Sequence, residues 1–205
     1  MTFAEKHSTM LATIGLAVVL FASTNIDDIF VLLGFFADRR YGERQIFAGQ
    51  YLGIAALIGV SIFASMIAFV FPAPYVALLG LLPVLIGCKK LMDLLKTEAA
   101  GKTLVSSRSG AGNIAAVAAL TIANGGDNIG IYTPVFATSS LGEVTVTIAV
   151  FALMVAVWIL SARWLVNHQS LGMPIRRFGH RIAPVVLIAI GIYVMYEGGA
   201  LTLFR

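Results

Sequence analysis

Six long apolar segments constrain the fold of this chain more than any other feature of its sequence. A helix needs about 20 mostly apolar residues to cross the hydrocarbon core of a bilayer. Segments of about that length lie at 10–36, 45–71, 73–95, 112–137, 141–166 and 182–203. Hydrophobic residues make up 59% of the chain and charged residues only 12%, whereas soluble domains carry about 25% charged residues. We therefore predict an all-α integral membrane protein with six transmembrane helices.

The basic residues predict the orientation of these helices. Twelve of the 14 Lys and Arg residues lie in or beside the loops that follow the first, third and fifth segments. Only Lys6 and Arg205 lie on the opposite side. Because basic residues in short loops stay in the cytoplasm, we expect both termini on the outer or periplasmic side of the inner membrane. Topology and headgroup contacts account for these charges, so no nucleic-acid partner is expected.

An internal repeat relates the two halves of the chain. Thr24-Asn25-Ile26-Asp27-Asp28-Ile29 in the first segment matches Asn124-Gly125-Gly126-Asp127-Asn128-Ile129 in the fourth, 100 residues later. Pro83-Val84-Leu85-Ile86-Gly87 in the third segment matches Pro184-Val185-Val186-Leu187-Ile188 in the sixth, 101 residues later. Each half would hold three helices, so the second half would enter the membrane from the other side. Such an inverted repeat is typical of secondary transporters.

The repeat sets the domain organisation that we expect. The whole chain, residues 1–205, would form a single transmembrane transporter domain. Its first repeat would cover about 1–97 and its second about 111–205, with a cytoplasmic linker at about 98–110. Small residues such as Gly53, Ala56 and Gly59 could pack helices within one chain or between the chains of a homo-oligomer.

Three carboxylates lie inside the predicted spans. Asp27 and Asp28 belong to the first span and Asp127 to the fourth. A charged side chain at the bilayer centre costs about 2.5–3.5 kcal/mol on insertion scales, so three of them predict a function. Corresponding positions of inverted halves meet near the midplane. A cation bound between them would neutralise the carboxylates, and protons would do so in its absence. A purely structural alternative pairs these acids with Lys89, Lys90 or Arg163.

The residues around these acids predict two broken helices. Gly125 and Gly126 weaken the fourth span and free backbone carbonyls, which membrane proteins tolerate only where the backbone is buried or lines a cavity. Pro134 is expected to kink the same span. The predicted metal ligands are Asp27, Asp28, Asp127 and Asn128, and the further substrate-binding candidates are Thr24, Asn25 and Asn124. We expect Gln50, near the start of the second span, to be an interfacial polar residue.

The ligand types indicate the substrate and the energy source. Carboxylate and amide oxygens suit Mg²⁺, Ca²⁺ and Mn²⁺ and, less exclusively, Zn²⁺ or Cd²⁺. The sequence contains no P-loop, so we expect a secondary transporter without enzymatic activity and without a resident cofactor. Proton antiport is the expected coupling, because protons and metal ions compete for the same carboxylates.

Three motifs together resemble a known family. Asn25-Ile26-Asp27-Asp28, Leu79-Gly80-Leu81-Leu82-Pro83 and Gly125-Gly126-Asp127-Asn128-Ile129 are similar to sequences of the cadmium resistance transporter (CadD-type) family, within the LysE superfamily. The resemblance implies efflux of Cd²⁺, with other divalent ions, from the bacterial cytoplasm. It also implies that Asp27, Asp28, Asp127 and Asn128 are the functional positions.

Three other functions compete with Cd²⁺ export. An exporter of Mn²⁺ or Zn²⁺, or of divalent cations in general, would use the same ligands. An amino-acid or small-amine exporter of the LysE superfamily would need groups that recognise a carboxylate and an amine together, but the spans show acids without a clear basic partner. An intramembrane aspartyl protease would need a Gly-x-Gly-Asp element, and Asn124-Gly125-Gly126-Asp127 lacks its first Gly.

Overall fold

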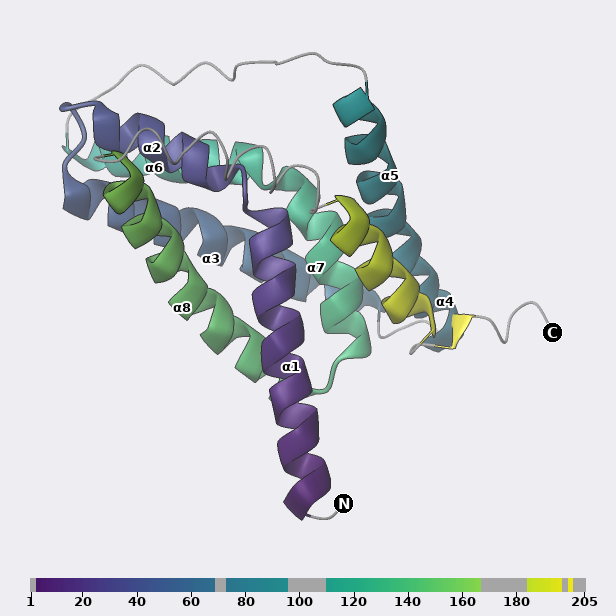
Figure 1. Cartoon of the computed structure of the whole chain (residues 1–205). Helices are drawn as coiled ribbons and strands as arrows, with labels where there is room; N and C mark the ends of the chain where they lie inside the picture. Colours follow the sequence, from purple (N-terminus) through teal and green to yellow (C-terminus); the bar gives the residue numbers. More distant parts are fainter. Residues whose placement is uncertain (1–2, 69–72, 96–109, 167–183, 197–198, 201–205) are drawn as a thin grey trace.

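Every regular element among the described residues is a helix (Figure 1). The computed structural model describes residues 3–68, 73–95, 110–166, 184–196 and 199–200. In chain order the elements are α1 (Phe3–Thr24), α2 (Asp28–Ala37), α3 (Glu43–Ala68), α4 (Ala73–Ala77), the 3₁₀ turn η1 (Leu78–Gly80), α5 (Leu81–Leu95), α6 (Gly110–Asn124), α7 (Gly126–Thr138) and α8 (Leu141–Val166). A further apolar helix covers Pro184–Tyr196. Apart from Gly110, which begins α6, the expected linker at 98–110 lies outside the described residues.

Two of the helices are long and apolar enough to cross a membrane by themselves, namely α3 and α8. Two further pairs reach that length together but are bent, α1 with α2 by 61° and α6 with α7 by 66°. The described stretches Tyr75–Lys89 and Pro184–Tyr196 are apolar but shorter than a full span. The all-helical membrane fold is therefore confirmed with two spans, or four if each bent pair is one span, and the six-span inverted repeat stays a prediction.

The two halves of the chain pack crosswise. The broken helix of the first half, α1 and α2, packs against α8, while α3 packs against α6 and α7 of the second half. Aromatic rings fill the contact between α1, α7 and α8. Phe21 meets Phe151 and Trp158 edge-on, with ring centroids 5.2 and 5.4 Å apart, and Tyr132 lies 5.0 Å from Phe151. Neither broken helix is therefore buried by its own half alone.

Glycine contacts join η1 and α5 to the Pro184–Tyr196 helix, which lies beside α5 in yellow in Figure 1. A Cβ atom added to Gly80 would lie 2.6 Å from the carbonyl oxygen of Gly191. A Cβ atom added to Gly87 would lie 2.7 Å from the carbonyl oxygen of Pro184. The two backbones can therefore approach this closely only because these positions lack side chains, as in many membrane helix pairs.

The outer surface of the bundle is apolar, as a bilayer requires. Phe63 on α3 and Leu153 on α8 are 68% and 70% exposed, and exposed apolar side chains also occur on α1, α5 and the Pro184–Tyr196 helix. In water such a surface would promote aggregation, whereas lipid chains solvate it. The described part of the chain thus has the surface of a membrane protein.

Candidate functional site at the two helix breaks

Both helix breaks follow residues whose side chains bond back to their own helix. Near the end of α1, the Ser23 hydroxyl donates to the carbonyl oxygen of Val19 (2.6 Å) and the Thr24 hydroxyl to that of Leu20 (3.0 Å). Near the end of α6, the Thr121 hydroxyl lies 3.0 Å from the carbonyl oxygen of Val117. Such bonds loosen and bend helices. The chain then turns and begins a new helix at Asp28 or Gly126.

The second break lies at Gly125, as predicted from the Gly-Gly pair. Gly125 has φ −90° and ψ 15°, and a Cβ atom there would lie 2.5 Å from Leu57 Cδ1 on α3. Gly126 is the first residue of α7, and α7 continues through the buried Pro134. The 66° change of direction between α6 and α7 therefore occurs at Gly125, nine residues before Pro134, and not at the proline.

Two hydrogen bonds cross from one break to the other. The Asn124 amide at the end of α6 donates to Asp28 Oδ1 at the start of α2. The Asn128 amide in the first turn of α7 donates to Asn25 Oδ1, just after α1, over 3.2 Å. A residue before each break thus bonds to a residue after the other break. The structure brings together four of the seven predicted site residues in this way.

Asp28 lies in a cage of amide donors. Only 2% of the residue is exposed. Gln50 Nε2 on α3 donates to Asp28 Oδ2 over 3.0 Å, and Asn124 donates to the other oxygen. Hydrogen bonds to an ionised group are stronger than those between neutral groups. The two amides therefore hold both oxygens of the Asp28 side chain, whereas Arg163 pairs with Glu43.

Asn25 is the centre of a second polar group. Its Nδ2 donates to the Phe21 carbonyl oxygen (2.9 Å) and lies 2.8 Å from the Tyr132 hydroxyl, and that hydroxyl lies 2.9 Å from Thr24 Oγ1. The Trp158 indole donates to the carbonyl oxygen of Asn25 over 2.6 Å. Helices α1, α7 and α8 are therefore joined at the first break.

Two oxygens of the predicted metal ligands are buried without a hydrogen-bond partner. They are Oδ1 of Asp27, which precedes α2, and Oδ1 of Asn128 in α7. Buried acceptors in folded proteins nearly always have a donor, so each of these two requires an explanation such as a bound ion. Asp127 lies half-buried in the first turn of α7. Among the described residues, no three Asp, Glu, His or Cys side chains gather as a metal-binding group. A cation at the breaks would therefore depend on amide as well as carboxylate oxygens.

Four polar residues of this centre were not predicted from the sequence. Gln50 was expected at the interface but is 2% exposed and touches Asp28, so that expectation was wrong. Thr121, Tyr132 and Trp158 look like ordinary helix residues, and only tertiary packing brings them to the breaks. The one local signal that Gln50 lies at a helix contact was the presence of Gly49 and Gly53 near it, because small residues mark a close helix contact.

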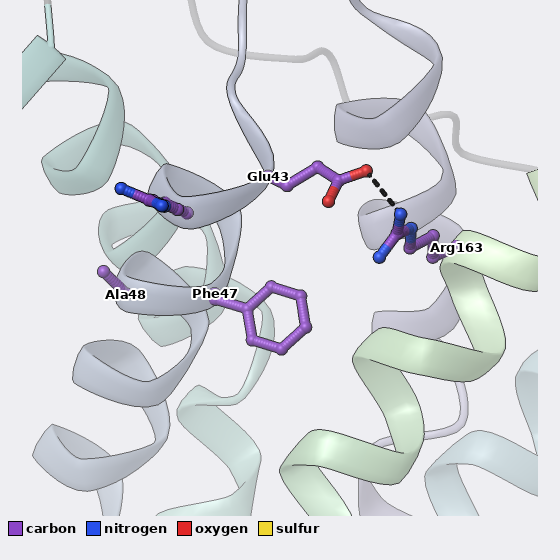
Figure 2. Close-up of a pocket in the computed structure, with 5 residues that line it drawn as sticks. Glu43, Phe47, Ala48 and Arg163 are labelled. Carbon is purple, nitrogen blue, oxygen red and sulfur yellow. Dashed lines mark ion pairs between the residues drawn. The ribbon is translucent and has the colours of Figure 1, made fainter.

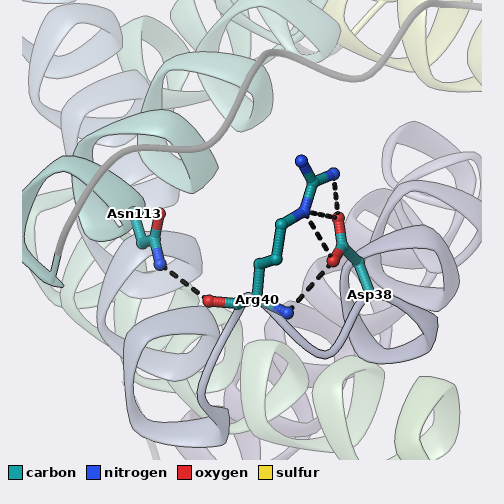
Figure 3. Close-up of polar contacts among 3 residues, drawn as sticks. All are labelled: Asp38, Arg40 and Asn113. Atoms are coloured by element: carbon teal, nitrogen blue, oxygen red, sulfur yellow. Dashed lines mark hydrogen bonds and ion pairs between the residues drawn. The ribbon is translucent and has the colours of Figure 1, made fainter.

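The loop between α2 and α3 is held by a separate group of polar contacts (Figure 3). Arg40 Nε donates to both Asp38 carboxylate oxygens, over 2.9 and 3.0 Å. These hydrogen bonds lower the pKa of Asp38 from its ordinary value and raise that of Arg40. Asn113 on α6 donates to the carbonyl oxygen of Arg40 (2.9 Å) and to Gln45 Oε1 (3.1 Å). The loop of the first half is therefore tied to the second half.

A surface pocket lies at the same end of the bundle (Figure 2). Its volume is about 480 Å³, and it is lined by Glu43, Arg44, Phe47 and Ala48 of α3 and by Arg163 of α8. Glu43 Oε1 and the Arg163 guanidinium form an ion pair at 3.1 Å, with both side chains about half exposed. Exposed pairs of this kind contribute little to stability. The contact nevertheless gives Arg163 a carboxylate partner at the start of α3.

Comparison with known proteins supports the family resemblance that the three sequence motifs indicate. The searches of curated proteins and of solved structures gave no significant match. The family model for cadmium resistance transporters matches residues 21–205, which include both helix breaks and all of the predicted ligands. The chain therefore belongs to the cadmium resistance transporter family.

Proposed function

We propose that this protein exports divalent metal cations, with Cd²⁺ as its main substrate, from the bacterial cytoplasm by proton antiport. The main support is Oδ1 of Asp27, which is buried at the first helix break without a hydrogen-bond partner. Oδ1 of Asn128 is a second such oxygen at the other break. A membrane-buried carboxylate oxygen without a donor favours a cation or a proton as its partner. Family membership supports metal transport independently.

The substrate site in this proposal uses Asp27, Asp28, Asp127 and Asn128 as ligands. Thr24, Asn25 and Asn124 contribute further oxygens or orient the ligands. Oxygen ligands bind Cd²⁺ less tightly than thiolates do and discriminate little against Mn²⁺ or Zn²⁺. We therefore propose weak binding, suited to release, and substrate competition among these ions.

Six spans arranged as two inverted repeats complete the proposal. The crosswise packing of α1 and α2 on α8, and of α6 and α7 on α3, supports it, as do the similar bends of 61° and 66°. In this arrangement both termini face the periplasm, and the loop that contains Asp38 and Arg40 faces the cytoplasm. Protons and metal ions compete for the same carboxylates, so that release of one accompanies binding of the other.

Metal flux in proteoliposomes tests the proposal. Cd²⁺, Mn²⁺ and Zn²⁺ flux would be followed in the wild type and in Asp127→Asn, with a pH-sensitive dye inside the vesicles. Glu143→Gln is the matched control, because it also removes one carboxylate but in the first turn of α8, where Glu143 accepts from the backbone N–H of Ser140. We expect metal flux with opposite proton movement in the wild type and the control, and none in Asp127→Asn. Absence of flux for all three metals in the wild type, or full flux in Asp127→Asn, would contradict the proposal.

A further inference from the structure

We infer that Gln50 is a positioning residue for Asp28, held in place by Thr121, and that this chain of side chains sets the affinity for the transported cation. The inference rests on the proposed function, because it takes Asp28 as a ligand of that cation. Gln50 lies on α3 and Thr121 on α6, so the chain reaches Asp28 from outside the motifs at the two breaks.

Both ends of the Gln50 amide are engaged although the residue is 2% exposed. Nε2 donates to Asp28 Oδ2 over 3.0 Å, and Oε1 accepts from the Thr121 hydroxyl over 2.7 Å. A buried amide without such partners would cost about 1–3 kcal/mol by mutational data. The burial of Gln50 is therefore compensated only while Asp28 and Thr121 are its neighbours.

Asp28 determines which way the amide of Gln50 faces, and Thr121 holds the other end of that amide. The Thr121 hydroxyl lies closer to Gln50 Oε1 (2.7 Å) than to the carbonyl oxygen of Val117 (3.0 Å). Because the carboxylate of Asp28 accepts hydrogen bonds, the NH₂ group faces it, and the amide oxygen then accepts from Thr121 on the α6 side. The reverse orientation would place the amide oxygen against a carboxylate, where two acceptors repel each other. Thr121 thus acts on Asp28 through Gln50.

Two glycines flank Gln50 and allow this contact. A Cβ atom on Gly49 would lie 2.8 Å from the carbonyl oxygen of Ile114, and one on Gly53 would lie 2.6 Å from Thr121 Cβ. Helices α3 and α6 therefore approach each other closely on both sides of Gln50. This close packing supports the side chain of Gln50 rigidly. Asn124, which donates to the other oxygen of Asp28, lies on the same helix as Thr121.

A carboxylate fixed at both oxygens presents its remaining lone pairs in set directions. Partners that orient a metal ligand typically change metal affinity by about 10- to 100-fold when they are removed. Loss of the Gln50 bond would leave Asp28 in place but would remove the donor that fixes its Oδ2. Weaker binding, rather than a slower cycle, is the expected consequence.

Transport kinetics with shape-preserving variants test the inference. Gln50→Met keeps the length of the side chain and removes its hydrogen bonds, and Thr121→Val removes only the hydroxyl. Cd²⁺ flux into proteoliposomes would be measured over a range of concentrations. We expect Gln50→Met to raise KM about 10- to 100-fold while the maximal rate changes by less than about threefold. Thr121→Val should raise KM less, and the double variant should match Gln50→Met, because Thr121 acts through Gln50.

Tyr51→Phe is the control for a general weakening of α3. It removes the hydrogen bond from Tyr51 to the carbonyl oxygen of Ala152 (2.9 Å) one residue after Gln50, and it should leave KM unchanged. A wild-type KM in Gln50→Met, in a protein that transports Cd²⁺, would overturn the positioning role alone. A fall in maximal rate with constant KM, or additive effects in the double variant, would also overturn it. A wild type that transports no divalent metal would overturn the proposed function and this role together.

Discussion

Asn128 donates a hydrogen bond to Asn25 Oδ1 over 3.2 Å, which joins the start of α7 to the turn that follows α1. The Asn124–Asp28 bond joins the same two breaks in the opposite sense. Each break is therefore held by a residue of the other half of the chain. A movement that opens one break must also release the other, which is a physical basis for a concerted change at the centre of the bundle.

Asp27→Asn should strongly impair transport but leave the fold intact. The buried Oδ1 of Asp27 has no hydrogen-bond partner, so no protein contact of that atom is lost with the charge. Loss of a ligand charge should lower Cd²⁺ transport at least as much as loss of an orienting partner, which is about tenfold or more. Proteoliposome flux and thermal unfolding in detergent would be measured side by side. Equal flux in wild type and variant would show that Asp27 is not a ligand.

Asp28→Leu should destabilise the protein, in contrast to Asp27→Asn. It removes the acceptor that the buried Gln50 Nε2 uses and one acceptor of the half-buried Asn124. Each unsatisfied group costs about 1–3 kcal/mol. The thermal midpoint in detergent should fall clearly, and Asp28→Asn, which keeps one oxygen acceptor, should fall less. An Asp28→Leu variant as stable as the wild type would argue against the cage of donors.

Gly53→Ala should disrupt the contact between α3 and α6. The new methyl group would lie 2.6 Å from Thr121 Cβ, so the helices must separate. Overpacking of this kind costs about 1–3 kcal/mol. Gly59→Ala on the same helix is the matched control, because nothing lies within 4 Å of its added Cβ atom and Ala favours a helix. Thermal unfolding should separate the two variants, and equal midpoints would contradict the close approach.

Trp158 should report the arrival of a cation at the first break. The chain has two Trp residues, and the indole of Trp158 donates to the carbonyl oxygen of Asn25 over 2.6 Å, whereas Trp164 is 52% exposed. In a Trp164→Phe background, Cd²⁺ should change the emission of Trp158. The reciprocal variant, Trp158→Phe, should show no response. A response from Trp164 alone would place the binding event elsewhere.

The Asp38–Arg40 contact should add a small, acid-sensitive stability. Hydrogen bonds from Arg40 lower the folded-state pKa of Asp38 below its ordinary value of 3.8. Stabilisation from such a group is complete above the unfolded pKa and is lost as the pH falls through the folded pKa. The thermal midpoints of wild type and Asp38→Asn should therefore differ slightly at pH 6 and converge below pH 3.8 as Asp38 becomes protonated. A difference that grows in acid would contradict the sign of the shift.

Local sequence signals predicted the breaks, because residue type acts there directly. Asn25 to Asp27 and Gly125 interrupt helices that the flanking apolar residues would otherwise continue, and the structure breaks at these positions. The partners of the breaks could not be predicted in this way. The contacts of Gln50 with Asp28 and Thr121 span 22 and 71 residues, and they depend on how closely α3 approaches α6.

The lengths of the helices in the third and sixth predicted spans also could not be predicted from the sequence. The apolar residues of 73–95 predict one continuous helix, but a 3₁₀ turn at Leu78–Gly80 interrupts it. Hydropathy does not register that turn, because its residues are as apolar as their neighbours. The segment at 182–203 lies only partly within the described residues.

The crosswise packing has a consequence for biosynthesis. When the ribosome has completed α3, Asp28 can already meet Gln50, but Asn124 and the helices α6 and α7 that cover α3 do not yet exist. In the same way α1 and α2 lack their packing partner until α8 has been synthesised. The first half of the chain must therefore remain incompletely assembled in the membrane until most of the second half has been translated, and a truncated product would carry an uncovered polar centre that quality-control proteases can recognise.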